Sequence, residues 1–235
     1  MISNSTIDEN TDTTSGNVAI GDLSASEAVA FALVAGTGDT DNARFTIDEG
    51  ELQILQDQVV DHEVQDSYSV LVQATDAAGN SSTEVLTITV NDLAEQVVLD
   101  ASVFAAAGGL VTIRLAGDQI EFVDDEGDSV SPSHDADKVT SISATGRSGA
   151  DDTLVVDVNG LGDLPVSFEG GTGGNDGLEI IDSGESTFST VTHQFDTPND
   201  GMVTISSGPA ITYTCLLYTS PSPRDQRGSR MPSSA

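Results

Sequence analysis

Acidic side chains dominate the ionisable groups of this sequence and are the first candidates for chemistry. The 235 residues include 39 aspartates and glutamates but 7 lysines and arginines, for a formal net charge of −32. Carboxylate oxygens suit Ca²⁺, which takes six to eight oxygen ligands at about 2.3–2.6 Å. In an extended segment alternate side chains point the same way. We therefore expect Asp61 and Glu63, in VDHE, to converge on one ion, and His62 between them to point away into solvent.

Catalytic residues have weaker support in the sequence. His134 and His193 lie near acidic residues, but neither a G-x-S-x-G nor an H-E-x-x-H spacing accompanies them. In a chain this acidic such neighbours are expected by chance, so we expect no enzyme. Nucleic acid is also excluded as a partner, because phosphate binding needs clustered lysine and arginine.

The C-terminal segment, 215–235, changes these counts, because it resembles translated sequencing-library adapter rather than a natural Ser/Pro/Arg-rich tail. Cys215 to Asp225 matches one adapter and Ser229 to Ala235 an adjoining primer in the same frame. We set this segment aside as a disordered tail. It holds three of the basic residues, a single acid and the only cysteine, so the rest of the chain is still more acidic and has no cysteine. Such a charge fits bound calcium, a saline habitat, or both.

Short stretches of alternating apolar and polar residues predict strands in residues 1–95. Glu49-Gly50 is expected to form a hairpin turn between Phe45–Ile47 and Leu52–Ile54. Several strands at such spacing predict an antiparallel sandwich. The residues expected to share a buried face are Tyr68, Val70, Val72 and Ala74 in one strand, with Leu71 as the exception, and Leu86, Ile88 and Val90 in another.

A composition shift at Gln96–Ala107 marks the expected boundary to a second β-rich domain, 96–214. Its GADDTLVVD (149–157) and GGTGGNDGLEI (170–180) resemble the turns of calcium-binding β-roll repeats, with Leu154 and Leu178 at equivalent points. A solenoid needs three or more such turns, so ordinary hairpin turns are the favoured interpretation and a short β-solenoid the alternative. The predicted strands are 110–115, 119–123, 139–144, 154–158, 164–168, 178–181, 202–206 and 211–214.

Six motifs in order give residues 1–95 a resemblance to bacterial cadherin-type repeats. Each motif alone is weak, but together they cover the whole segment at the family's spacing. The resemblance implies a Greek-key β-sandwich within an all-β chain. The motifs are IDEN (7–10), GDLSASE (21–27), FTIDEGELQI (45–54), VDHE (60–63), SYSVLVQATDAAGN (67–80) and LTITVNDLAE (86–95).

The same resemblance implies two places for Ca²⁺. At one end of the sandwich it gathers carboxylates from the first strand, the VDHE motif and the closing linker, which are Glu9, Asp61, Glu63, Asp92 and Glu95. At the opposite pole it gives Asp76 and Glu27. The chain departs from the family at Val29 and Ala94, where the family has a second Asp and an Asn, so each place has lost a ligand.

Together these features predict a calcium-binding structural and adhesion module of a large bacterial protein, extracellular or at the cell surface. Its expected partners are neighbouring repeats of the same chain and other cells or matrix. No apolar run approaches the roughly 20 residues of a membrane span. The alternative is a non-catalytic, glycan-binding appendage of a secreted hydrolase. The absence of tryptophan and an aromatic content of 4% argue against that alternative.

Overall fold

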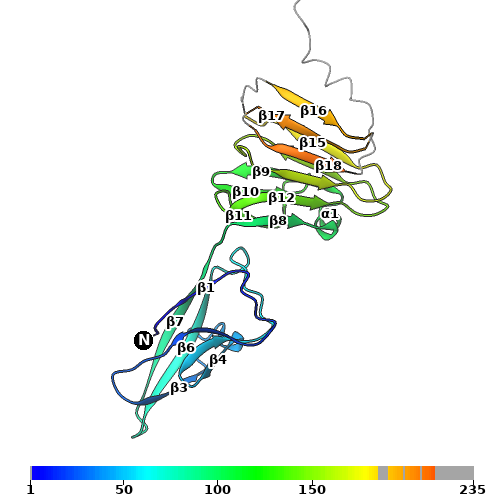
Figure 1. Cartoon of the computed structure of the whole chain (residues 1–235). Helices are drawn as coiled ribbons and strands as arrows, with labels where there is room; N and C mark the ends of the chain where they lie inside the picture. The colour runs from blue at the N-terminus through cyan, green and yellow to red at the C-terminus, as the bar shows by residue number, and fades with distance from the viewer. Residues whose placement is uncertain (1, 185–189, 198, 207, 215–235) are drawn as a thin grey trace, which may run out of the picture. The chain divides into compact units, whose positions relative to one another are not determined.

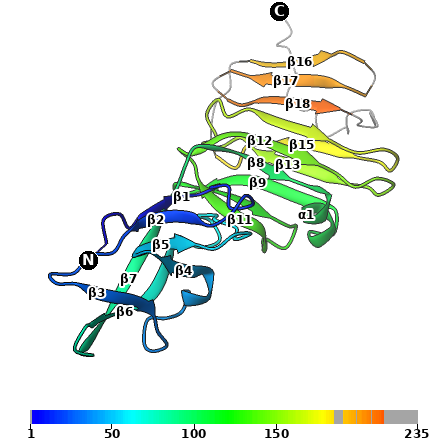
Figure 2. The ribbon, with the colours of Figure 1, turned by 60° about the horizontal axis from the view of Figure 1, so that its bottom comes forward.

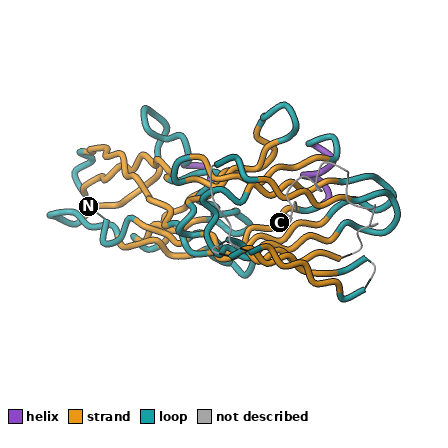
Figure 3. Tube along the Cα trace, turned by 90° about the horizontal axis from the view of Figure 1, so that it is seen from above, coloured by secondary structure: helices purple, strands orange, loops and turns teal. Residues whose placement is uncertain are grey.

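A computed structural model describes residues 2–184, 190–197, 199–206 and 208–214. The predicted adapter-like tail lies outside these residues. The chain forms two compact units, Met1–Leu93 and Ala94–Ala235. Strands are the main regular structure of each unit, and the helical segments of the described chain are short (Figures 1 and 3). The predicted all-β class is confirmed.

The first unit is a sandwich of a four-stranded and a three-stranded sheet. The sheet orders are β1-β7-β6-β3 and β2-β5-β4, and β1 runs parallel to β7. Both sheets contribute to one core, which includes Ile54, Tyr68 and Ile88. The strands are β1 Thr6–Asp8, β2 Val18–Asp22, β3 Val29–Leu33, β4 Phe45–Asp48, β5 Glu51–Ile54, β6 Ser67–Asp76 and β7 Ser81–Asn91, with a 3₁₀ turn, η1, at Asn42–Arg44.

Alternation along the strands explains how this core forms. Tyr68 and Val70 of β6, and Leu86, Ile88 and Val90 of β7, are buried as predicted. Burial of a side chain of this size contributes about 1.5–3 kcal/mol. Glu49 and Gly50 take φ values of 48° and 88° and join β4 to β5, so the predicted hairpin turn is also confirmed.

The second unit is built from parallel strands that alternate between two sheets. The orders are β11-β10-β9-β13-β15 and β16-β17-β18-β14-β12-β8, and Figure 2 shows these strands side by side. The bounds are β8 Glu95–Leu99, β9 Leu110–Ala116, β10 Gln119–Val123, β11 Ser129–Asp135, β12 Val139–Thr145, β13 Thr153–Asp157, β14 Val166–Glu169, β15 Gly177–Ile181, β16 Val191–Phe195, β17 Gly201–Ile205 and β18 Ala210–Thr214, with helix α1 at Ala101–Ala106.

This arrangement is a short β-solenoid, and the favoured prediction of hairpin turns at the Gly-Asp motifs was wrong. Leu154 of β13 pairs in parallel with Leu178 of β15. Ile142 of β12 pairs with Val166 of β14 at the same separation in sequence, which is the length of one coil. The Gly-Asp segments therefore carry the chain from one sheet to the other, and the next segment stacks on the previous one. The antiparallel hairpins β10–β11 and β16–β17 extend the two sheets from β9 and β18.

The division between the units, after Leu93, lies close to the predicted boundary, and Gln96–Ala107 is ordered structure of the second unit, the domain to which it was assigned. This segment forms most of β8 and all of α1. The Asp100 carboxylate accepts a hydrogen bond from the Ser102 N–H at 2.8 Å and so caps the helix. Phe104 of α1 is fully buried and stacks on Phe168 of β14. The alanine-rich composition reflects a helix whose inner face packs on the core.

Candidate metal centre

The segment that contains VDHE is a turn, not an extended strand. The Gln65 N–H donates to the Asp61 carbonyl at 3.0 Å, four residues back, which is one turn of helix. The Asp61 carboxylate accepts from the Val64 N–H at 3.0 Å. Side chains of successive residues in such a turn fan around one end instead of alternating between two faces. The premise behind the predicted orientation of His62 was therefore wrong.

Glu9 connects this turn to the two ends of the first unit. It follows β1 directly and retains 2% of its exposure. One carboxylate oxygen accepts from the His62 N–H at 3.2 Å and the other from the Leu93 N–H at 2.6 Å. Hydrogen bonds to ionised groups are stronger than neutral ones. Glu9 thus holds the chain at β1, at the turn and at the last residues of the unit.

Carboxylates of three predicted ligands come together around this point. Glu9, Asp61 and Glu63 each offer an oxygen, and these oxygens lie within 4.8 Å of one another. Asp92, from the segment after β7, joins Glu63 and His62 in a second group with the same spacing. Four of the five predicted carboxylates therefore belong to overlapping groups at one end of the first unit. A cation bound by these groups would take oxygens from three separate parts of the chain.

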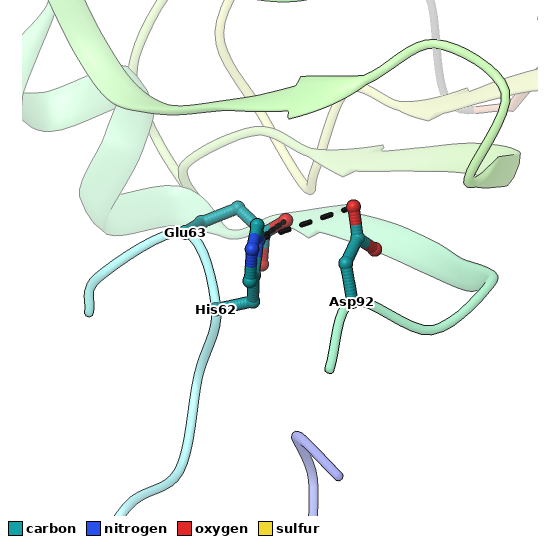
Figure 4. A group of neighbouring side chains, drawn as sticks. All are labelled: His62, Glu63 and Asp92. Carbon is teal, nitrogen blue, oxygen red and sulfur yellow. Dashed lines mark ion pairs between the residues drawn. The ribbon is translucent and has the colours of Figure 1, made fainter. Parts of the chain in front are cut away.

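His62 belongs to this cluster, contrary to the sequence-based expectation. Its Nδ1 lies 3.7 Å from a Glu63 carboxylate oxygen and 3.9 Å from one of Asp92, and its side chain is 30% exposed. Figure 4 shows His62 and Glu63 on one segment and Asp92 on another, with the ion pairs dashed. Sequence pattern missed this histidine because alternation applies to strands and not to a turn.

Glu95, the fifth predicted ligand, belongs to the second unit. It lies at the start of β8, and its carboxylate is 3.0 Å from Nδ1 of His134 on β11. Its backbone N–H donates to the Lys138 carbonyl at 2.8 Å. Within its own unit, Glu95 therefore serves an ion pair and the pairing of β8 beside β12.

The two acids predicted at the opposite pole do not join a group of three or more candidate ligands among the described residues. Asp76 closes the β6–β7 turn, since its carboxylate accepts from the N–H groups of Ala78 and Asn80 and from the Asn80 side chain, all at 2.8–2.9 Å. The bonds from Asn80 are the main reason that the pKa of Asp76 is lowered. Glu27 is exposed in the loop before β3. Asp76 therefore has a structural role.

The Gly-Asp segments of the second unit hold a different acidic arrangement. Asp152 is fully buried, and its Oδ1 accepts from two guanidinium nitrogens of Arg147, Nη2 at 2.7 Å and Nε at 2.8 Å. This pairing raises the pKa of the Arg147 guanidinium. Asp176, one coil later, accepts from the Asp152 N–H at 3.0 Å and retains 6% exposure. Burial raises the pKa of the Asp176 carboxyl, with the charge of Asp152 as a smaller cause.

Glycine allows these segments to stack closely. A Cβ added at Gly170 would lie 2.6 Å from Cβ of Asp176, and one at Gly146 would lie 2.7 Å from the carbonyl oxygen of Gly170. The interval from Gly146 to Gly170 equals the interval from Asp152 to Asp176. The equal spacing in GRSGADDTL and GGTGGNDGL was the sequence signal that could have revealed the coil.

Comparison of the sequence with protein-family models and with curated proteins finds no match. No helix in the described part of the chain has the length and hydrophobicity needed to cross a bilayer.

Proposed function

We propose that the first unit binds Ca²⁺ at Glu9, Asp61, Glu63 and Asp92, and that the chain is a structural and adhesion module of a large bacterial extracellular or cell-surface protein. One observation carries the proposal: the oxygens of Glu9, Asp61 and Glu63 lie within 4.8 Å of one another. Hard oxygen donors in such a group are the ligands that Ca²⁺ prefers. The resemblance of residues 1–95 to bacterial cadherin-type repeats supports the same assignment.

Repulsion between the neighbouring carboxylates favours the binding of a cation. Two like charges 4 Å apart repel by about 1 kcal/mol in bulk water and by about 4 kcal/mol at an effective dielectric constant of 20. Arg44 is the one lysine or arginine in residues 1–93. It donates to the Gln58 side chain at 3.3 Å and lies over the Tyr68 ring. A divalent ion would replace this repulsion with attraction.

Calcium at this position would act mechanically rather than catalytically. Glu9 already links β1 to the turn and to Leu93 through two backbone N–H groups. An ion shared with Asp61, Glu63 and Asp92 would fix the last residues of the unit and stiffen the connection that follows. The second unit, with its stacked coils, suits a spacer. Neighbouring repeats, other cells and matrix are the proposed partners.

The test is thermal unfolding of the whole chain in EDTA and then in CaCl₂, with NaCl and MgCl₂ at matched ionic strength. Extracellular calcium modules bind at about 10⁻⁴–10⁻³ M. At a hundred times the dissociation constant, binding stabilises the folded unit by about 2.7 kcal/mol. We expect a saturable rise in melting temperature with CaCl₂ that NaCl does not reproduce. General screening of the acidic surface would give equal shifts with all three salts, and that result would overturn the proposal.

Two matched variants locate the ion. Asp61→Asn removes a charge from the cluster and keeps the oxygen that accepts the Val64 N–H. Asp57→Asn removes a charge from an exposed residue of the same unit whose φ of 62° suits asparagine equally well. We expect about a tenfold loss of calcium affinity in the first variant and wild-type affinity in the second. Equal affinities in the two variants would place the ion elsewhere.

A further inference from the structure

A nitrogen donor lies among the acids at this end of the first unit. The Nδ1 atom of His62 is 3.7 Å from a Glu63 oxygen and 3.9 Å from an Asp92 oxygen, and the three donor atoms lie within 4.8 Å of one another (Figure 4). This group differs from the one formed by Glu9, Asp61 and Glu63, because it includes an imidazole.

The donor types select a class of metal. Calcium binds through oxygen, whereas imidazole nitrogen with carboxylate oxygen suits Zn²⁺ and the neighbouring first-row divalent ions. A zinc ion with bonds of about 2.0–2.1 Å in a tetrahedron holds its ligand atoms about 3.4 Å apart. The distances from Nδ1 are therefore a few tenths of an ångström wider than a bound zinc ion requires. Side-chain rotation alone can close that difference.

The backbone around these side chains is held in place independently of any metal. The His62 N–H donates to one oxygen of buried Glu9, and the N–H of Leu93, next to Asp92, donates to the other. The turn that carries His62 and Glu63 is closed by the bond from Gln65 to Asp61. Glu9 thus positions the two segments that bear the nitrogen and oxygen donors. The partial exposure of His62 leaves solvent access for a fourth ligand.

We propose that His62, Glu63 and Asp92 form a binding site for a divalent transition metal of the Zn²⁺ class, with water completing the coordination. The ligands of this site differ from those of the proposed calcium site, since zinc binding needs His62 and does not need Asp61. It shares Glu63 and Asp92 with the calcium ligands. The two ions therefore compete, and zinc weakens the apparent affinity for calcium.

The experiment is calorimetric titration of ZnCl₂ into the whole chain in a Cys215→Ser background, which removes the thiol as a ligand. His62→Gln is the test variant, and His193→Gln is the control for histidine content. We expect one saturable zinc site, weakened at least tenfold by His62→Gln and unchanged by His193→Gln. Equal zinc affinity in the two variants, or no saturable binding in the parent, overturns the proposal.

Cross-measurement with calcium separates this inference from the proposed function. His62→Gln should lose zinc binding and keep the calcium-induced rise in melting temperature, whereas Asp61→Asn should do the reverse. A loss of zinc binding in His62→Gln could also come from damage to the turn, so imidazole NMR of the parent chain tests directly whether His62 binds zinc. Zinc should shift the ring nitrogens of His62, identified by their absence in His62→Gln. A shift confined to His134 or His193 would contradict the site, whatever the variants show.

Discussion

The two units place carboxylates close together in different ways. In the first, Glu9, Asp61 and Glu63 share one end, and its one basic residue, Arg44, contacts Gln58 and Tyr68 instead. In the second, buried Asp152 has Arg147 as a partner, with two guanidinium nitrogens on one carboxylate oxygen. The first unit therefore gathers several acids at one end, whereas the second pairs its most buried acid with an arginine.

This difference has a physical consequence for how each unit responds to ions. Removing one partner from a buried ion pair leaves an uncompensated charge and is strongly destabilising. A cluster of like charges is stabilised when a cation binds the folded form. Stability of the first unit should therefore depend on divalent ions, and stability of the second on its own arginine.

The largest effect we expect comes from the core of the second unit and tests whether the units are independent. Leu154 is fully buried where β13 lies between β9 and β15. Leu154→Ala should destabilise that unit by about 2–5 kcal/mol, because it loses buried area and leaves a cavity. Chemical denaturation, monitored by hydrogen exchange of the amides of the second unit, would measure this loss in the free energy of unfolding.

The control for this change is Leu178→Ala, one coil along the same sheet. Leu178 is partly buried, so its truncation should cost less. Calcium affinity of the first unit should stay at its wild-type value in both variants. A changed calcium affinity in Leu154→Ala would show that the units are coupled and would break the comparison.

Calcium should produce the next largest effect, confined to particular amides. The N–H groups of His62 and Leu93 donate to Glu9, whereas that of Asp152 donates to Asp176. Saturation at a hundred times the dissociation constant should slow exchange of the first two by up to about a hundredfold. The Asp152 amide should exchange at the same rate with and without calcium. Hydrogen exchange with mass spectrometry measures both; slowing at Asp152 would mean that the second unit also binds the ion.

Local sequence pattern predicted the first unit well because its contacts follow strand alternation. The buried faces of β6 and β7 and the Glu49-Gly50 turn depend on neighbours in sequence. Leu71 broke the alternation, and it is buried because the loop at Gly36 lies against it. His62 was misplaced because VDHE was taken as a strand, whereas the Gln65 and Val64 N–H groups close a turn on Asp61. The Glu9 carboxylate that accepts from the His62 N–H is distant in sequence.

The second unit was harder to predict for a related reason. Its strands were found from their apolar residues, and the bounds of β10 were those predicted. Their pairing is parallel and joins segments a whole coil apart in sequence, so it depends on contacts that no local pattern contains. The strands β8, β11 and β16 were missed, and all three lie at sheet edges. In β11 and β16 many residues are polar or exposed, so the alternation of apolar and polar residues is weak.

The ion pair of the second unit provides the third prediction. Arg147→Met should lower the melting temperature of that unit by several degrees in both EDTA and calcium, because Asp152 stays buried without its cation. The double variant with Asp152→Asn should recover most of the loss, since the amide oxygen carries no charge. Differential scanning calorimetry measures the series. Rescue of Arg147→Met by calcium would indicate that an ion can replace the arginine, and the contrast between the units would disappear.

The smallest effect concerns the sign of a pH dependence. Burial raises the pKa of Asp176 above its usual 3.8. A raised pKa in the folded state means that the carboxyl contributes stability below the unfolded pKa, and that this contribution is lost as pH rises through the folded pKa. Asp176→Asn should therefore raise the melting temperature at pH 7. An asparagine already occupies the neighbouring position, where the Asn175 N–H donates to Asp151 of the previous coil.

Asp76 of the first unit is a control, because its effect on stability should depend on pH with the opposite sign. Hydrogen bonds from Asn80 lower its pKa, so its contribution is present above the unfolded value of 3.8 and is lost as pH falls through the folded pKa. Asp76→Asn should lower the melting temperature at pH 7. The difference from wild type should shrink toward zero below the unfolded pKa of 3.8 for Asp176→Asn, and below the lowered folded pKa for Asp76→Asn. Melting curves from pH 7 to pH 3 measure this, and a loss of stability in Asp176→Asn at pH 7 would contradict the expected sign.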